Sequence, residues 1–198
     1  MYRDAHQLGT VARVALELML NVAARRGDAC QLGRQHITKD GRLSWHPNKT
    51  RRSTRQAVTV RMLPELKAAL DAMSPSVSLT FLTNDYGKPF ASAAAFGNKF
   101  ADWCRRAGIE GIIGDDQQRR NFRAHGLRKA ACVRLAEAGC TAPEIMAVSG
   151  HRTLAQVQIY IEEANRKRMA EAAMDKLSET ETETTSGKPS DPNWQTGS

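Results

Sequence analysis

Apolar residues occupy nearly every face of residues 10–24, a pattern that predicts a buried central helix rather than an amphipathic surface helix. Farther along, residues 36–38 and 43–45 flank a Lys-Asp-Gly turn, which is typical of a β-hairpin. Residues 57–62 alternate and are rich in β-branched side chains, as expected of a third strand. Together these patterns predict a mainly α-helical fold with a small three-stranded antiparallel β-sheet.

Helical patterns return after the third predicted strand. We expect three helices there, over residues 64–73, 92–107 and 123–138. Residues 109–118 predict a loop. Two capping boxes of the form S/T-x-x-E/Q begin at Thr141 and Thr153, and each predicts the start of a further helix. Residues 163–177 form a separate, last amphipathic helix in this interpretation.

Charge divides the chain into two unequal parts. The 198 residues carry a formal net charge of +8, and the pI is about 9.6. Residues 178–198 hold four acidic residues and one lysine, a net charge of −3, which leaves +11 on the first 177 residues. A basic body predicts an anionic partner such as a nucleic acid. Because the last segment is poor in hydrophobic residues, we expect one domain over residues 1–177 and a disordered acidic tail over residues 178–198.

The cysteine spacing and the apolar runs argue against a metal-binding protein and against a membrane protein. The four cysteines form no C-x-x-C pair, and the sequence has no cysteine–histidine metal spacing and no Gly-rich phosphate loop. We therefore expect reduced thiols, no metal and no cofactor. The longest apolar run, over residues 14–24, contains Glu17 and Asn21 and is too short to span a bilayer. The sequence predicts a soluble, cytoplasmic protein without a membrane segment.

Polar residues that suit phosphate chemistry recur in the helical second half of the chain, and two more lie far upstream. They are Arg25, Lys49, His125, Arg128, His151 and Tyr160. Phosphodiester cleavage collects negative charge on the non-bridging oxygens, which arginine neutralises with bidentate hydrogen bonds. A tyrosine nucleophile must lose a proton with a usual pKa of ~10, and the leaving 5′ oxygen needs a proton that a lysine can donate. The pattern indicates metal-free cleavage of a DNA backbone with Tyr160 as the nucleophile.

In these motifs the chain resembles the catalytic domain of the tyrosine recombinases, the phage integrase family, over about residues 8–177. The segment Ala-Arg-Arg-Gly-Asp-Ala is similar to the family's first-arginine segment, with Asp28 in place of the usual glutamate. The adjacent Arg26 competes for this assignment, and the following Gly-Asp pair favours Arg25. Lys49 falls in the loop between the second and third strands, where the family keeps its lysine. The other candidates match the H-x-L-R box, the G-H element and the tyrosine nucleophile.

The resemblance implies a mechanism for site-specific DNA recombination. Tyr160 attacks a phosphodiester, forms a 3′-phosphotyrosyl link and releases a 5′ hydroxyl. Arg25 and Arg128 hold the phosphate, and Lys49 acts as the general acid. The covalent link conserves the energy of the bond, so rejoining needs neither a metal nor a cofactor.

Further residues take supporting roles in the same scheme. His125 serves in proton transfer, His151 hydrogen-bonds the phosphate, and Asp28 supports the Arg25 region. Double-stranded DNA is the expected partner. Arginines in the loop between strands two and three and before the H-x-L-R box are candidates for contacts with the DNA backbone, namely Arg51, Arg52, Arg55, Arg119, Arg120 and Arg123.

Other interpretations of the sequence stay open. The resemblance begins almost at Met1, so we expect the N-terminal DNA-binding domain of full-length members to be absent. That favours a truncated DNA-binding remnant without cleavage activity, whereas the intact set of candidates favours an enzyme. A relaxing nickase similar to the type IB topoisomerases shares the same chemistry. In the family, the segment after the nucleophile often packs on a neighbouring protomer, so the helix over residues 163–177 is a candidate for homo-oligomer contacts.

Overall fold

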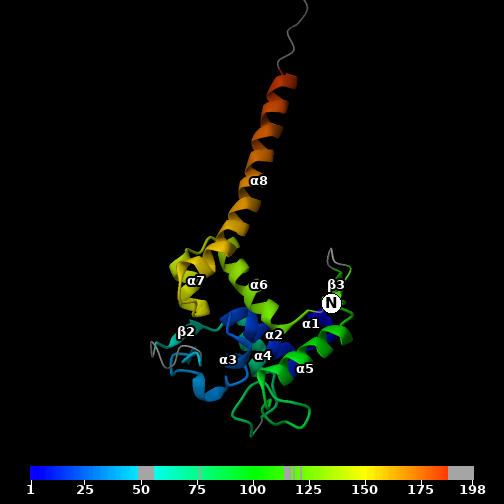
Figure 1. Cartoon of the computed structure of the whole chain (residues 1–198), viewed down its shortest axis with the longest axis vertical. Coiled ribbons are helices and arrows are strands. Elements are labelled where there is room, and N and C mark those ends of the chain that lie inside the picture. The colour runs from blue at the N-terminus through cyan, green and yellow to red at the C-terminus, as the bar shows by residue number, and fades with distance from the viewer. Residues whose placement is uncertain (49–55, 76, 114–116, 118, 121, 187–198) are drawn as a thin grey trace, which may run out of the picture.

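The computed structural model describes residues 1–48, 56–75, 77–113, 117, 119–120 and 122–186. The described part of the chain is mainly helical, with two short antiparallel strand pairs (Figure 1). In chain order the elements are α1 (Tyr2–Ala5), α2 (Val11–Val22), α3 (Arg26–Ala29), η1 (Arg34–His36), β1 (Arg42–Trp45), β2 (Val58–Arg61), α4 (Pro64–Asp71), α5 (Ala93–Arg106), β3 (Ile112–Ile113), β4 (Arg119–Arg120), α6 (Ala124–Glu137), α7 (Ala142–Ser149) and α8 (Leu154–Ser186).

The predicted central helix is confirmed by α2. Its apolar side chains are buried on almost every side because α4, α5 and α6 all pack against it. Thr10 caps the N-terminus, where its side chain accepts a hydrogen bond from the backbone N–H of Arg13 at 3.2 Å. The helix ends at Ala23, which adopts the left-handed conformation with φ 47°. This turn directs the chain into the segment that carries Arg25.

The central helix carries a buried charged residue, Glu17. Glu17 is only 3% exposed, and its carboxylate forms ion pairs with Arg3 at 2.9 Å and Arg13 at 2.7 Å. Arg3 binds both carboxylate oxygens, each at 2.9 Å. A buried carboxylate is tolerated only when it is paired in this way. Glu17 therefore ties α1 to the central helix.

The predicted three-stranded sheet is not confirmed. Among the described residues, β1 and β2 form a two-stranded sheet in which Leu43 lies opposite Val60. The expected first strand is reduced to a single bridge between Ile37 and Leu43. The preceding residues form the 3-10 turn η1, and Thr38 uses its side chain and its backbone to close a tight turn onto Arg42. Those hydrogen bonds leave too little extended backbone for a third strand.

A second departure concerns residues 109–118, which the sequence predicted to be a loop. Here β3 pairs with β4 in a short antiparallel hairpin, with Ile112 opposite Arg120. Each strand has only two residues, so the alternation on which a strand prediction depends is absent.

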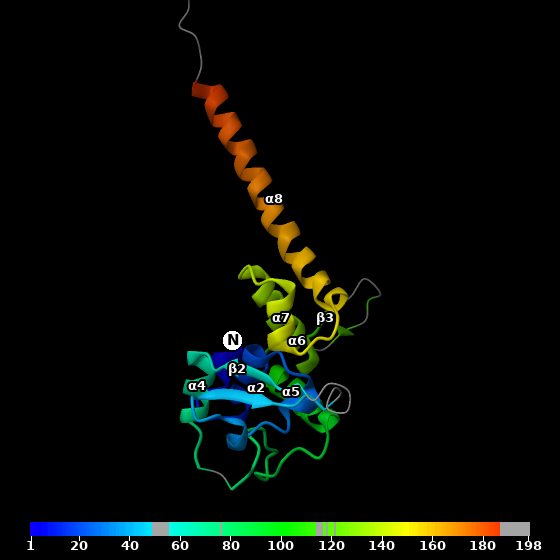
Figure 2. The ribbon, with the colours of Figure 1, turned by 90° about the vertical axis from the view of Figure 1, so that its left-hand side faces the viewer.

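The buried side chains form two clusters. The larger one surrounds α2 and includes the sheet, α4 and the aromatic side chains of α5. The smaller one lies between α6, α7 and α8, and Ala23 at the end of α2 belongs to it. Figure 2 shows the corresponding arrangement, with the sheet, α2, α4 and α5 below α6 and α7. Arg25, Arg128 and His151 come from the segments where the two clusters meet.

The C-terminal helix differs from the expectation. A single helix, α8, replaces the two helices predicted from Thr153 onward, and it continues to Ser186. Residues 178–186, which the sequence placed in a disordered tail, are therefore helical, while 187–198 lie outside the described residues. Only the first part of α8 packs on α6 and α7, and the rest extends away from the body (Figures 1 and 2).

Candidate active site

Arg128 lies at the centre of the candidate site and is only 4% exposed. It is on α6, and its Nη1 donates hydrogen bonds to the backbone carbonyls of Ala23 and, at 2.7 Å, Ser149. These contacts hold one side of the guanidinium between the end of α2 and the end of α7. Its Nη2 is buried without a hydrogen-bond partner among the described residues. A fixed guanidinium with an unpaired N–H group is suited to binding an anion.

Arg25 lies beside Arg128, immediately before α3. Its side chain is half-buried, and its Nη1 is also buried without a hydrogen-bond partner in the described part of the chain. Burial lowers the pKa of Arg128, and the positive charge of Arg25 lowers it further. Two guanidinium groups that repel each other and keep unpaired N–H groups are stabilised when an anion lies between them.

Asp28, the predicted supporting residue, is 6% exposed on α3. Its Oδ1 accepts a hydrogen bond from the backbone N–H of Asn48 at 2.9 Å, and the Asn48 side chain donates to Gln31 at 3.1 Å. These contacts anchor the chain just after β1, at the residue that precedes Lys49. Asp28 therefore connects the Arg25 segment to the start of the loop that carries the candidate lysine.

His151 follows Gly150, which ends α7 in the left-handed conformation with φ 67°. The Nδ1 of His151 lies 2.7 Å from the Ser149 hydroxyl oxygen. Burial lowers the pKa of His151 to about 4, with the positive charges of Arg128 and Arg25 as further causes. At neutral pH the imidazole is therefore uncharged.

Tyr160 lies on α8 and is half-buried. Its ring centre is 6.1 Å from that of His151, and the two ring planes are inclined by 42°. Tyr160 also packs against the smaller core cluster, whose α6 residues neighbour Arg128 in the chain. The structure thus brings together four of the predicted residues, Arg25, Arg128, His151 and Tyr160.

Two further predicted residues, His125 and Arg123, are not part of this cluster. His125 is exposed in the first turn of α6, and Arg123 is exposed at the N-cap of the same helix. Arg119 and Arg120 form β4, of which only the backbone is described. The remaining basic candidates lie outside the described residues, namely Lys49, Arg51, Arg52 and Arg55.

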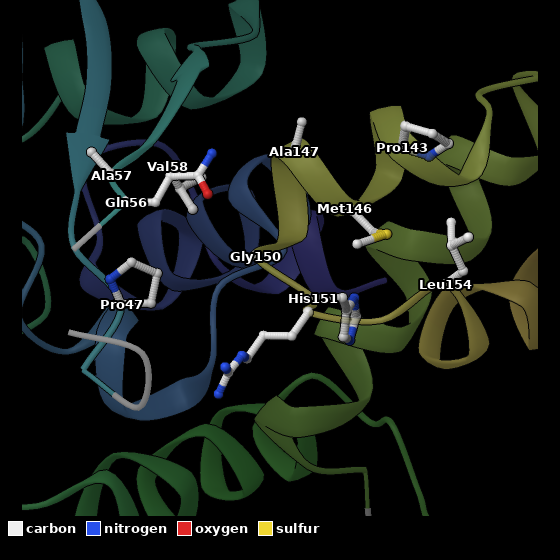
Figure 3. A pocket seen from close by; sticks show the side chains of 11 residues that line it. Pro47, Gln56, Ala57, Val58, Pro143, Met146, Ala147, Gly150, His151 and Leu154 are labelled. Atoms are coloured by element: carbon white, nitrogen blue, oxygen red, sulfur yellow. The ribbon is translucent and has the colours of Figure 1, made fainter. Parts of the chain in front are cut away.

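A pocket of about 530 Å³ opens beside His151 (Figure 3). The end of the β1–β2 hairpin, with Pro47 and Val58, forms one side, and α7 with Met146 forms the other. The segment with Gly150 and His151 lies between these two sides. The candidate site therefore borders a hollow shared by the sheet and the helical C-terminal part.

Sequence reasoning missed two residues that shape the site, Ser149 and Ala23. Ser149 is adjacent to the Gly-His motif, but no pattern in the sequence shows that its side chain contacts His151. The carbonyl of Ala23 is available to Arg128 because α2 ends there, which only the fold reveals. Within the described ranges, no group of three or more His, Cys, Asp or Glu residues is placed to hold a metal ion. None of the described helices is long and apolar enough to cross a membrane.

Similar folds occur among solved structures. The XerA recombinase is 16% identical, with a TM-score of 0.66 and coverage of 86% of this chain and 60% of that chain. A lambda integrase dimer bound to a COC′ core site is 20% identical, with a TM-score of 0.61 and coverage of 81% and 55%. The Tn1549 transposon integrase in complex with transposon right end DNA is 14% identical, with a TM-score of 0.57 and coverage of 81% and 58%. At these identities the likeness shows a shared fold, and the chain spans less than two thirds of each of these proteins.

Sequence comparison gives the family. A search of curated proteins found no match. In contrast, the model of the phage integrase family matches residues 2–167, which include all the candidate catalytic residues and most of the described chain. This chain therefore belongs to the phage integrase family.

Proposed function

We propose that this chain breaks and rejoins DNA strands in site-specific recombination, through a covalent 3′-phosphotyrosyl intermediate. One observation carries the proposal: beside His151 and Tyr160, Arg25 and Arg128 each have a buried N–H group that finds no partner among the residues that the structure describes. A phosphodiester satisfies both arginines at once and offsets their mutual repulsion. The same position brings the phosphorus to the vicinity of the tyrosine.

The chemical step follows from this arrangement. The oxygen of Tyr160 attacks the phosphorus, a new O–P bond forms, and the bond from phosphorus to the 5′ oxygen breaks. Arg25 and Arg128 neutralise the charge that develops on the non-bridging oxygens. The 5′ oxygen leaves with a proton, and we assign the role of general acid to Lys49. The support is that Lys49 follows Asn48 in the chain, and the backbone N–H of Asn48 is held by Asp28 of the Arg25 segment.

Further roles follow the family motifs. We assign a contact with the phosphate to His151 and a part in proton transfer to His125, whose exposed position allows it to reach a bound strand. Contacts with the DNA backbone are assigned to the basic residues around the site, which are Arg51, Arg52, Arg55, Arg119, Arg120 and Arg123. We take residues 1–177 to be the catalytic unit.

A nicked-substrate assay tests the function. The substrate is a pool of duplex oligonucleotides with randomised sequence and a nick just downstream of the test phosphate, so that cleavage releases a short fragment and traps the protein on DNA. We expect an SDS-resistant adduct with the wild-type chain and none with Tyr160→Phe. Tyr86→Phe is the matched control, because Tyr86 is 86% exposed and lies in a turn away from the candidate site.

The outcomes separate the candidate functions. An adduct that persists in Tyr160→Phe contradicts the assignment of the nucleophile. DNA binding without any adduct supports a remnant that no longer cuts. Exchange of strands between two duplexes indicates a recombinase, whereas relaxation of supercoiled DNA without exchange indicates a nickase similar to the type IB topoisomerases.

We also propose that two copies of the chain associate on DNA through residues 163–177 of α8. The support is that, after the buried Ala164, this part of α8 extends away from the body of its own chain with Met169, Met174 and Leu177 exposed (Figure 1). Apolar side chains on an unpartnered helix are typical of an interaction surface. Light scattering of the DNA complex tests this: Met174→Glu is expected to reduce the dimer, and Ala172→Glu on the same exposed helix is not.

A further inference from the structure

Ser149 connects the two halves of the candidate site through different atoms. Its backbone carbonyl accepts a hydrogen bond from Arg128 at 2.7 Å, and its side-chain oxygen lies 2.7 Å from Nδ1 of His151. The residue is 3% exposed, so water has little access to the hydroxyl. The polar contacts of Ser149 are therefore made with protein atoms rather than with water.

The hydroxyl has one hydrogen, and one oxygen and one nitrogen atom lie within hydrogen-bond distance of it. Its oxygen lies 2.6 Å from the carbonyl of Ile145, four positions earlier on α7, and 2.7 Å from His151 Nδ1. A carbonyl oxygen can only accept, so the hydroxyl must donate to Ile145. Otherwise two oxygen lone pairs would face each other at 2.6 Å. The hydroxyl oxygen is then an acceptor toward His151, and Nδ1 of His151 must carry a hydrogen.

A neutral imidazole carries one ring hydrogen, so Nε2 is left with a free lone pair. The neutral state is the relevant one, because burial and the neighbouring arginines lower the pKa of His151 to about 4. The thiol of Cys132, which also interacts with the Ser149 side chain, stays protonated because burial raises its pKa. No charged group among these neighbours competes for the Ser149 hydrogen.

We propose that Ser149 is a positioning residue that holds neutral His151 in the Nδ1–H tautomer and so makes Nε2 the proton acceptor for Tyr160. The inference rests on the proposed function for its chemical consequence. The proton of the Tyr160 hydroxyl moves to Nε2 as the oxygen–phosphorus bond forms. The departing 5′ oxygen takes its proton from the general acid, so the step is balanced. The imidazolium that results can then donate Nε2–H to a phosphate oxygen.

The tautomer is measured directly in the free protein, without DNA or activity. Protein labelled with ¹⁵N-histidine is compared by long-range ¹H–¹⁵N NMR at pH 7, and the spectrum of His151→Gln identifies the His151 signals among the five histidines. We expect the Nδ1–H form in the wild type and in Ser149→Thr, which keeps a hydroxyl. The Nε2–H form is expected to rise in Ser149→Ala. An Nε2–H tautomer in the wild type, or no change in Ser149→Ala, overturns the proposal.

Cleavage kinetics give the second readout. Ser149→Ala keeps the carbonyl that binds Arg128, so DNA binding is expected to stay unchanged while adduct formation slows by about tenfold or more. In a chain that already carries His151→Ala, Ser149→Ala is expected to slow adduct formation no further, because the imidazole through which Ser149 acts is absent. Additive losses would indicate a merely structural role.

Val148→Ala is the matched control, since Val148 is the preceding residue on α7 and packs against both core clusters. A loss as large as that in Ser149→Ala would mean that looser packing of α7 is the cause, and the proposal would fail. If the wild-type chain forms no adduct at all, the proposed function fails, and the NMR result still decides whether Ser149 sets the tautomer.

Discussion

The guanidinium of Arg128 donates a hydrogen bond to the backbone carbonyl of Ala23, which lies 105 positions earlier in the chain. This contact joins the end of the central helix to α6, the helix that carries the H-x-L-R motif. The Nη2 atom of Arg128 is buried and has no hydrogen-bond partner within the described residues. The fold thus uses one half of the guanidinium for structure and leaves the other for an anion.

Arg128→Lys tests this division. Lysine keeps the positive charge but cannot bind two carbonyls and a phosphate with one planar group. We expect adduct formation in the nicked-substrate assay to fall by about a hundredfold or more, as for other donors that stabilise a transition-state charge. Circular dichroism checks that the variant is folded. Lys129→Arg, a swap of the same kind at the exposed neighbouring position, is expected to form the adduct at the wild-type rate.

We expect the protonation of His151 to lower the stability of the folded chain in mild acid. Its pKa is about 4 in the folded chain and about 6.5 in the unfolded chain, so the unfolded state binds the proton more tightly. The stability that the folded chain gains from keeping His151 neutral is fully present above pH ~6.5 and is lost as the pH falls toward 4. Urea unfolding of His151→Gln between pH 7 and 4.5 is therefore expected to show a weaker pH dependence than the wild type.

The exposed His125 supplies the control for this measurement. The substitution His125→Gln is expected to leave the pH dependence of unfolding as it is in the wild type. An equal change in the two variants would show that the buried environment of His151 is not the cause.

The ion pairs of Glu17 and Asp85 differ in burial, so we expect their removal to lower the free energy of unfolding by different amounts. Glu17 is 3% exposed and pairs with Arg3 and Arg13, whose side chains are 48% and 16% exposed. Glu17→Ala therefore removes a buried carboxylate and its charge-assisted hydrogen bonds, while both arginines keep access to water. We expect the free energy of unfolding to fall by about 1.5–3 kcal/mol. Asp85 pairs with Lys99 but is 73% exposed, so Asp85→Ala is expected to cost less than about 1 kcal/mol. Similar losses in denaturant unfolding would show that burial does not decide the strength of these pairs.

The backbone conformation of Gly150 is expected to affect both the stability of the chain and the position of His151 in the candidate site. It has φ 67°, and a Cβ at this position would lie 3.3 Å from a methyl carbon of Val58. Gly41 has a similar φ of 74° with nothing within 4 Å, so it is the matched control. Both alanine variants are expected to lose about 1 kcal/mol or more through backbone strain. Only Gly150→Ala should also slow adduct formation, because it displaces the adjacent His151.

The sequence by itself determined much of the architecture. The apolar run in residues 10–24 predicted the central helix, since a helix that is hydrophobic on all sides must be buried. Capping boxes located the start of α7 and of α8, because they depend on short-range hydrogen bonds. The third strand and the break before residue 163 were not confirmed, since tight turns and helix continuation depend on contacts that periodicity does not record.

For the site, the sequence determined which residue types are present, and the tertiary structure decided how they meet. The motifs identified Arg25, Arg128, His151 and Tyr160, which the fold brings together. His125 lies three positions before Arg128 on α6 and is exposed, whereas Arg128 is buried and reaches the carbonyls of Ala23 and Ser149. Hydrogen bonds between segments far apart in the chain have no sequence signature, so the unpaired guanidinium groups and the role inferred for Ser149 became visible only in the folded chain.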